Sequence, residues 1–82
     1  MKILFFASLR EEFNTDQMIL SLPSGSTTAC LPNALSVSLK RPIGGTLNQE
    51  GVRVAVNLEI QEDPVELCDG DEVAFFPPIT GG

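Results

Sequence analysis

The chain has 82 residues, 43% hydrophobic and 20% charged, so we expect one small domain over residues 1–82 with a modest core. Its formal charge of −6, with only 5 Lys and Arg, excludes nucleic acid as an expected partner, because proteins that bind phosphate backbones neutralise them with clustered basic residues. No apolar run approaches the ~18 residues of a membrane span, so no membrane partner is expected either.

The inventory of reactive side chains is short. Histidine is absent, which removes the commonest general base and the commonest metal ligand together. Cys30 and Cys68 are too few for a disulfide framework or an iron–sulfur cluster, and their spacing matches no zinc motif. We therefore expect a cytoplasmic protein with reduced thiols, no bound metal or cofactor and no conventional active site of its own.

The N-terminal part of the chain is expected to form a strand, a short helix and a second strand. Alternating apolar residues predict strands over 2–7 and 17–22. Between them, Ser8 and Glu11 have the spacing of a capping box, which predicts one or two helical turns that end near Asn14.

The middle of the chain is expected to contain the main helix. Apolar residues at helical spacing predict this helix over about 29–40, with Thr27 or Thr28 able to cap its start. Pro32 is harmless in the first helical turn, so the N-terminus of the helix should be irregular. A loop is expected from residue 41 to residue 51.

The last third of the chain is expected to form three strands. They cover 52–57, a short segment around Ile60, and 72–76, which follows a turn at 69–71. The order strand, strand, helix, strand, short strand, strand fits an α+β fold in which a twisted sheet holds one main helix on one face.

The other sheet face is then open, and it carries large apolar side chains. Strand alternation places Phe6, Ile60 and Phe76 there, together with Leu4 if the strand parities hold. Three large apolar residues on an open face indicate a surface for a protein partner. The alternatives are a loop that covers the patch or an inverted strand parity.

The C-terminal segment over 77–82 is expected to be a flexible arm. Pro77 and Pro78 favour an extended backbone, and the six residues can project the carboxylate roughly 20 Å beyond the last strand. Gly81 and Gly82 have no Cβ, which suits a tip that enters a narrow channel. The alternative is an ordinary frayed terminus.

Three segments of the sequence, KILFFASLRE, VAVN and DGDEVAFFPPITGG, resemble the small, sulfur-carrier subunit of molybdopterin synthase. The segment from Thr27 to Gly51 departs from that family. The resemblance implies a ubiquitin-like β-grasp fold with a mixed sheet. It also implies a non-catalytic subunit, because the active site of the synthase lies in the large subunit.

The resemblance further implies how the chain works. A separate ATP-dependent enzyme would adenylate Gly82 and convert it to a thiocarboxylate, which donates sulfur to cyclic pyranopterin monophosphate to form molybdopterin. Two small and two large subunits would form a heterotetramer. The family pattern assigns channel-threading positions and docking positions to this chain, the first being Pro77, Pro78, Ile79, Thr80 and Gly81, the second Phe6, Ile60 and Phe76.

Two other functions remain open at this point. A β-grasp carrier could serve thiamin synthesis or a transfer-RNA thiolation system instead, although those relatives resemble the Phe-Phe-Pro-Pro segment less well. A protein modifier could form isopeptide bonds through Gly82. The large subunit that co-purifies would identify the pathway, and adducts of high molecular weight would indicate a modifier.

Overall fold

The computed structural model describes residues 1–78, so the expectations for Ile79, Thr80, Gly81 and Gly82 lie outside the described residues. The elements in chain order are β1 (Lys2–Phe5), α1 (Ala7–Phe13), β2 (Gln17–Ile19), the 3₁₀ turn η1 (Thr28–Cys30), α2 (Leu31–Leu39), α3 (Gly44–Leu47), β3 (Arg53–Val56), β4 (Glu59–Gln61) and β5 (Glu72–Phe76).

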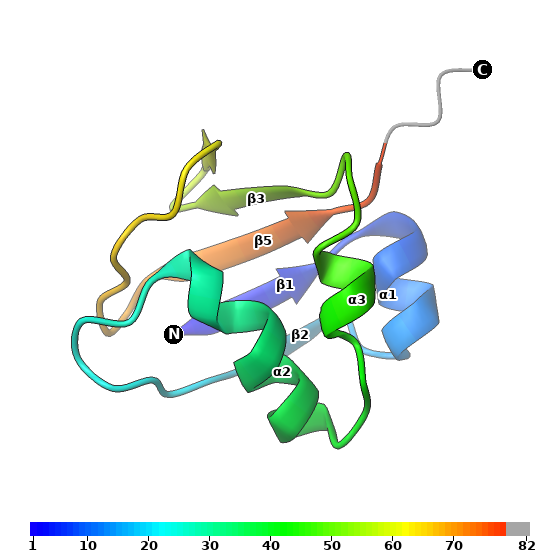
Figure 1. Ribbon diagram of the computed structural model, residues 1–82, viewed down its shortest axis with the longest axis horizontal. Coiled ribbons are helices and arrows are strands. Elements are labelled where there is room, and N and C mark those ends of the chain that lie inside the picture. The colour runs from blue at the N-terminus through cyan, green and yellow to red at the C-terminus, as the bar shows by residue number, and fades with distance from the viewer. Residues whose placement is uncertain (79–82) are drawn as a thin grey trace.

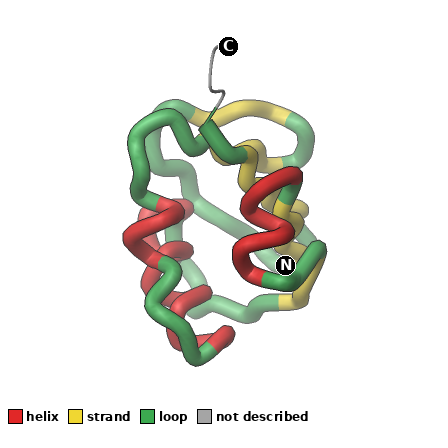
Figure 2. Tube along the Cα trace, turned by 90° about the vertical axis from the view of Figure 1, so that its right-hand side faces the viewer, coloured by secondary structure: helices red, strands yellow, loops and turns green. Residues whose placement is uncertain are grey.

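The strands form one mixed sheet in the order β2-β1-β5-β3-β4 (Figure 1). The two central strands, β1 and β5, run parallel, and every other pair is antiparallel. Helices α2 and α3 lie together on one face of the sheet, and the view turned by 90° shows them on one side of the molecule with strands on the other (Figure 2). This arrangement confirms the expected α+β fold.

The core lies between the central strands and α2. Its fully buried side chains come from β1, β5 and α2, and they are Ile3, Phe5, Leu31, Leu35 and Val73. Phe5 stacks on Phe75 with 5.9 Å between ring centroids and meets Phe13 of α1 edge-on at 5.1 Å. These contacts bury the inward face of the central strands, as the alternation of apolar residues predicts.

Helix α1 ends where the sequence predicts but begins differently. Its N-cap residue is Phe6, which makes no side-chain capping bond, so the capping-box interpretation is wrong. The first strand also ends at Phe5, and Ala7 enters the helix with a φ of +51°.

At the C-terminal end of α1, the guanidinium of Arg41 donates hydrogen bonds to the carbonyl oxygens of Phe13 (3.1 Å) and Glu12 (3.0 Å). These bonds satisfy carbonyl groups that have no partner within the last turn of the helix.

The main helix has the expected irregular start. The hydroxyl of Thr27 accepts the N–H of Ala29 (3.3 Å) at η1, and Pro32 lies in the first turn of α2. The segment expected as a loop contains the short helix α3. Ser36 of α2 holds its start, because the Ser36 hydroxyl accepts the N–H of Ile43 (3.1 Å) and of Gly44 (2.9 Å).

The predicted bounds are confirmed for β5, whereas β1, β2 and β3 are shorter than predicted. Strand β5 covers 72–76 as predicted, and β4 includes Ile60. Strand β2 ends at Ile19 instead of Leu22, because its pairing with β1 stops at Lys2, close to the start of the chain. The expected turn before β5 is present, and Gly70 occupies it with a φ of +88°.

A hydrogen-bonded carboxylate joins that turn to the β3–β4 hairpin. Oδ2 of Asp71 accepts the N–H of Cys68 (2.7 Å), and Oδ1 accepts Nδ2 of Asn57 (3.0 Å). The bond from the Cys68 N–H, followed by the bond from Asn57, lowers the pKa of Asp71 from its ordinary value of 3.8. The ionised carboxylate therefore stabilises the fold.

Because the pKa of Asp71 is lowered by folding, its contribution to stability is complete above pH 3.8 and is lost as the pH falls through the lowered pKa. We expect the urea midpoint of the parent to drop as the pH is lowered through this window. D71N should be less stable at neutral pH and should lose part of that acid dependence. Asp69→Asn, at an exposed position in the same turn, is the matched control. Equal acid dependence in D71N and the parent would contradict this role.

Candidate functional site: the open sheet face and the base of the C-terminal arm

The sheet face opposite the helices carries an apolar row that crosses four strands. The strand register aligns Leu4 with Ala74, Ala74 with Ala55, and Ala55 with Ile60. The two middle positions are alanines, so the row is low at its centre and higher at both ends. Ala55 is only 5% exposed although it lies on this open face, which shows how closely the larger side chains surround it.

A second row lies beside the first and contains the two aromatic residues predicted for this face. The N–H of Phe6 donates to the carbonyl of Phe75 (3.2 Å), which continues the parallel pairing of β1 and β5 past the end of β1. The rings of Phe6 and Phe76 consequently stack, with centroids 4.9 Å apart and planes 6° apart. Arg53 pairs with Phe76 from the other side and completes the row.

The two rows enclose a shallow hollow of about 170 Å³. Its lining includes Phe6, Ile60 and Phe76, so the structure brings together the three residues that the sequence predicts on this face, with Leu4 beside them. Ile60 is 55% exposed and Phe6 is 38% exposed. The role of these residues in docking remains a prediction.

Three further residues shape this hollow, and the sequence assigns no site role to them. They are the alanines of its floor and Leu58 at its edge. Strand alternation places Ala74 on the outward face, and it places Ala55 there too, because Ala55 stands between valines predicted to share the other face. Leu58 lies in a turn, where alternation gives no signal.

A larger apolar hollow of about 390 Å³ begins where the sheet ends and the C-terminal arm starts. Its lining consists of Arg53, Ile60, Phe76, Pro77 and Pro78. Since Ile60 and Phe76 line both hollows, the open face continues without interruption into the first residues of the arm. The remaining predicted arm residues lie beyond the part of the chain that the structure describes.

Gly51 lies against the base of the arm. It has a φ of +94°, and a Cβ built on it would lie 2.9 Å from the Cβ of Pro78, closer than real Cβ contacts allow. The loop before β3 therefore touches the arm at a position where only glycine fits. The base of the arm therefore packs directly against the backbone of this loop.

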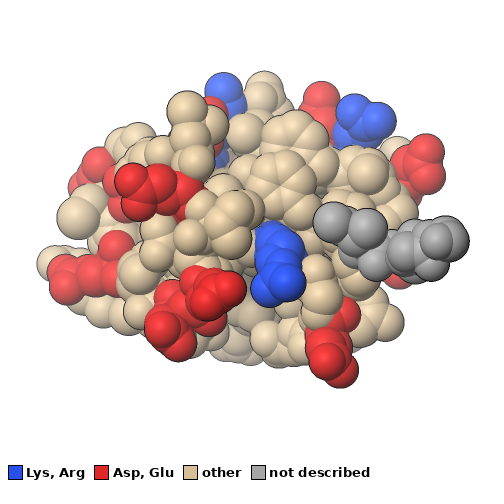
Figure 3. Space-filling model, turned by 90° about the horizontal axis from the view of Figure 1, so that it is seen from above, with Lys and Arg blue, Asp and Glu red and all other residues tan. Residues whose placement is uncertain are grey.

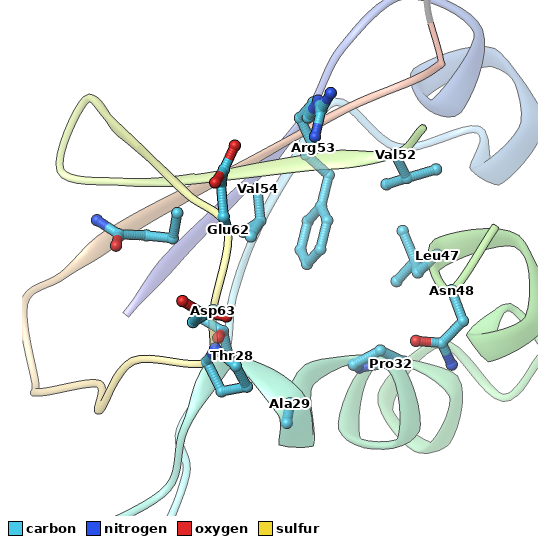
Figure 4. A pocket seen from close by; sticks show the side chains of 13 residues that line it. Thr28, Ala29, Pro32, Leu47, Asn48, Val52, Arg53, Val54, Glu62 and Asp63 are labelled. Carbon is cyan, nitrogen blue, oxygen red and sulfur yellow. The ribbon is translucent and has the colours of Figure 1, made fainter. Parts of the chain in front are cut away.

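A third hollow lies on the helix side of the sheet, between η1 and α2 on one side and β3 and β4 on the other (Figure 4). It measures about 170 Å³ and has a mixed lining, in which apolar residues such as Pro32 and Leu47 stand beside polar and charged ones such as Glu62 and Asp63. Over residues 1–78, no three His, Cys, Asp or Glu side chains gather as possible metal ligands, and no helix there is long and apolar enough to cross a membrane.

The sheet order, the covered face and the open face define a ubiquitin-like β-grasp domain. The same fold is found in SAMP1 from Haloferax volcanii, with a TM-score of 0.84 at 23% identity, covering 100% of this chain and 98% of that chain. It is also found in a protein–protein complex of subunits 1 and 2 of the molybdopterin-converting factor from Helicobacter pylori, with a TM-score of 0.59 at 18% identity, covering 99% of this chain and 96% of that one.

The chain belongs to the ThiS family, whose model matches residues 3–82. It is 36% identical over 81 residues to the molybdopterin synthase sulfur carrier subunit of Escherichia coli, covering 99% of this chain and 98% of the relative. The Arabidopsis thaliana subunit of the same name is 38% identical over 86 residues, covering 99% and 81%. The resemblance inferred from the sequence is thereby confirmed, together with the β-grasp fold that it implies.

The contact between Gly51 and Pro78 can be tested by substitution. We expect Gly51→Ala to destabilise the protein by about 2 kcal/mol, because it adds a strained backbone conformation and a clash with the arm. For a domain of this size that loss lowers the melting temperature by roughly 10 °C.

Gly25→Ala is the matched control for backbone strain. Gly25 has a similar φ of +88°, but a Cβ there would have nothing within 4 Å. Melting curves of the two variants separate the two effects, since only Gly51→Ala adds the clash. If both variants melt at the same temperature, the Pro78 contact does not hold the arm.

Proposed function

We propose that the chain is the sulfur carrier of molybdopterin synthase and that the carboxylate of Gly82 carries the sulfur. The observation that supports this most directly is that the family match runs to residue 82, through the Gly-Gly end of the sequence. The curated relatives that bear this name match nearly the whole chain. The open apolar face beside the base of the arm gives such a carrier a surface on which to dock.

The chemistry proposed for Gly82 needs a second protein. A terminal carboxylate has a pKa near ~3.5, so it is ionised at neutral pH and is a poor electrophile. Attack of this carboxylate on the α-phosphate of ATP releases pyrophosphate and leaves an acyl adenylate. A sulfur donor then displaces AMP, and one oxygen of the carboxylate is replaced by sulfur. An ATP-dependent adenylating enzyme supplies this step, so the carrier itself binds no cofactor.

The second half of the cycle takes place in the large subunit. The arm enters a channel there, and the sulfur passes to cyclic pyranopterin monophosphate to build molybdopterin. The narrow tip suits this task because glycine presents no side chain to the channel walls. We assign the threading role to Pro77, Pro78, Ile79, Thr80 and Gly81, and the role of carrier to Gly82.

The open face is the proposed docking surface for both partners. Phe6, Ile60 and Phe76 lie around one hollow and stand next to the arm, so a partner that covers them also receives the tip. The complex described for the Helicobacter pylori relative is one between two subunits. We propose that two copies of this chain flank a dimer of large subunits, and that the large subunit and the adenylating enzyme compete for the same face.

Deletion of Gly82 tests the site of sulfur loading. It shortens the arm by about 3.5 Å, and reactive geometry tolerates little, since a misplacement of ~1 Å can reduce the rate about a hundredfold. After incubation with the adenylating enzyme, ATP and a sulfur donor, the intact mass of the parent should rise by the difference between sulfur and oxygen. The truncated chain should not gain this mass.

Gly45→Ala is a suitable control, because Gly45 is exposed in α3 and a Cβ there would meet nothing within 4 Å. This variant should be loaded like the parent. Loading of the truncated chain at the parent's rate would show that Gly82 is not the carrier. Adducts with other proteins, in place of a thiocarboxylate, would indicate a protein modifier.

Phe76→Ala tests the docking surface. Central aromatic residues of interfaces commonly contribute about 2 kcal/mol or more, so the dissociation constant for the large subunit should rise at least tenfold. The loss of the stacked pair with Phe6 should lower stability only modestly, because both rings lie outside the core. Calorimetric titration measures the binding and a melting curve measures the stability. Unchanged binding by this variant would exclude the face as the docking surface.

A further inference from the structure

The turn between β3 and β4 is strained at a residue that the fold does not need. The strands pair from Val56 and Glu59, so the loop contains only Asn57 and Leu58. Both have positive φ, +49° and +72°, which is the pattern of a type I′ turn. Asparagine tolerates this conformation, whereas the second position strongly favours glycine and disfavours a branched apolar residue.

Packing does not explain the leucine either. Leu58 is 89% exposed, more than the other exposed large apolar side chains of residues 1–78, such as Ile19 at 74%. Its side chain therefore gains little from burial in this domain, and its backbone conformation is unfavourable. A residue that is unfavourable on both counts points to a role outside the folding of the chain.

The turn is nevertheless held firmly. The side chain of Asn57 donates to Asp71 (3.0 Å) and accepts the N–H of Glu72 (3.0 Å), and the Asn57 N–H donates to the carbonyl of Glu72 (2.8 Å). Asp71 is in turn held by the N–H of Cys68 (2.7 Å). These bonds fix the strained tip to the start of β5, so Leu58 is presented in a defined position.

That position adjoins the proposed docking surface. Leu58 lines the same hollow as Ile60, Ala55 and Phe76, and it extends the apolar surface to the end of the sheet opposite the arm. Carboxylates accompany it there, since Glu72 lines the hollow and Glu59 follows Leu58 in the chain. Seen from above, acidic side chains lie around a largely tan surface that also carries a Lys or Arg side chain near its middle (Figure 3).

We propose that Leu58 is an anchor for the large subunit, and that it enters an apolar socket whose rim carries Lys or Arg. The inference rests on the proposed function, because it assumes that this face docks to the large subunit. Two observations select this occupant: Leu58 is continuous with the surface around Phe76, and the carboxylates beside it complement a basic rim. A second copy of this chain, with a charge of −6, would instead bring like charges together.

The experiment compares three substitutions at one position, with the large subunit from the source organism as the probe. Leu58→Gly and Leu58→Asn remove the apolar side chain and suit the turn better, so the melting temperature should stay the same or rise. Their affinity for the large subunit should fall about tenfold. Leu58→Met keeps a large apolar side chain and should retain most of the parent's affinity.

Val37→Ala is the control for the loss of an exposed apolar group, since Val37 is 70% exposed on α2, on the helix side of the sheet. It should bind like the parent. A melting temperature that is kept or raised, together with weaker binding, is the result that supports an anchor, because a merely structural leucine would not separate the two.

Two results would overturn the inference without affecting the proposed function. The first is parent-like binding of Leu58→Gly and Leu58→Asn while Phe76→Ala binds weakly. The second is a parent chain that dimerises by sedimentation and becomes monomeric in Leu58→Gly, with binding to the large subunit unchanged. If the parent itself does not bind the large subunit, the proposed function fails and the inference fails with it.

Discussion

The parallel pairing of β1 with β5 is the interaction on which the rest of the structure depends. It places the first and last strands of the chain side by side at the centre of the sheet, with Phe5 opposite Phe75. One residue further along, the same register places Phe6 beside Phe76 on the other face. A single register thus builds the aromatic part of the core and the aromatic part of the open face. A slip of one residue would exchange the two sets and destroy both.

This arrangement also explains why the open face is hollow. Strand β5 of this pair and its neighbour β3 each contribute an alanine at the centre of the face, and larger side chains stand at both ends of the row. A flat apolar surface would suit any apolar partner, whereas a concave one favours a partner of complementary shape. The arm starts at the edge of this hollow and is held there by the contact between Gly51 and Pro78. Under the proposed function, a partner that covers this face would therefore also meet the base of the arm.

Much of this could be predicted from the sequence, and the errors have physical causes. Strand alternation predicted the inward and outward faces of β1 and β5 because burial on one face imposes a period of two. Helix α3 was missed because it contains two glycines and its start is held by Ser36, a residue of another helix. The capping box at Ser8 failed because the helix begins two residues earlier, with Phe6 as its N-cap, directly after Phe6 continues the pairing of β1. Leu58 was missed because it lies in the turn between β3 and β4, where strand alternation gives no signal.

The acidic surface and the apolar face have to be considered together. Under the proposed function, a carrier with two partners keeps this face exposed between encounters, and exposed apolar surface favours self-association. The charge of −6 opposes contact between copies, because association would bring like charges together. The same charge increases the rate of encounter with a partner whose rim is basic. The strained turn at Leu58 acts in the same direction, since it adds apolar contact area at a point bordered by carboxylates. The concave open face, the negative net charge and the fixed turn at Leu58 together favour a partner that has an apolar socket with a basic rim, and they disfavour self-association.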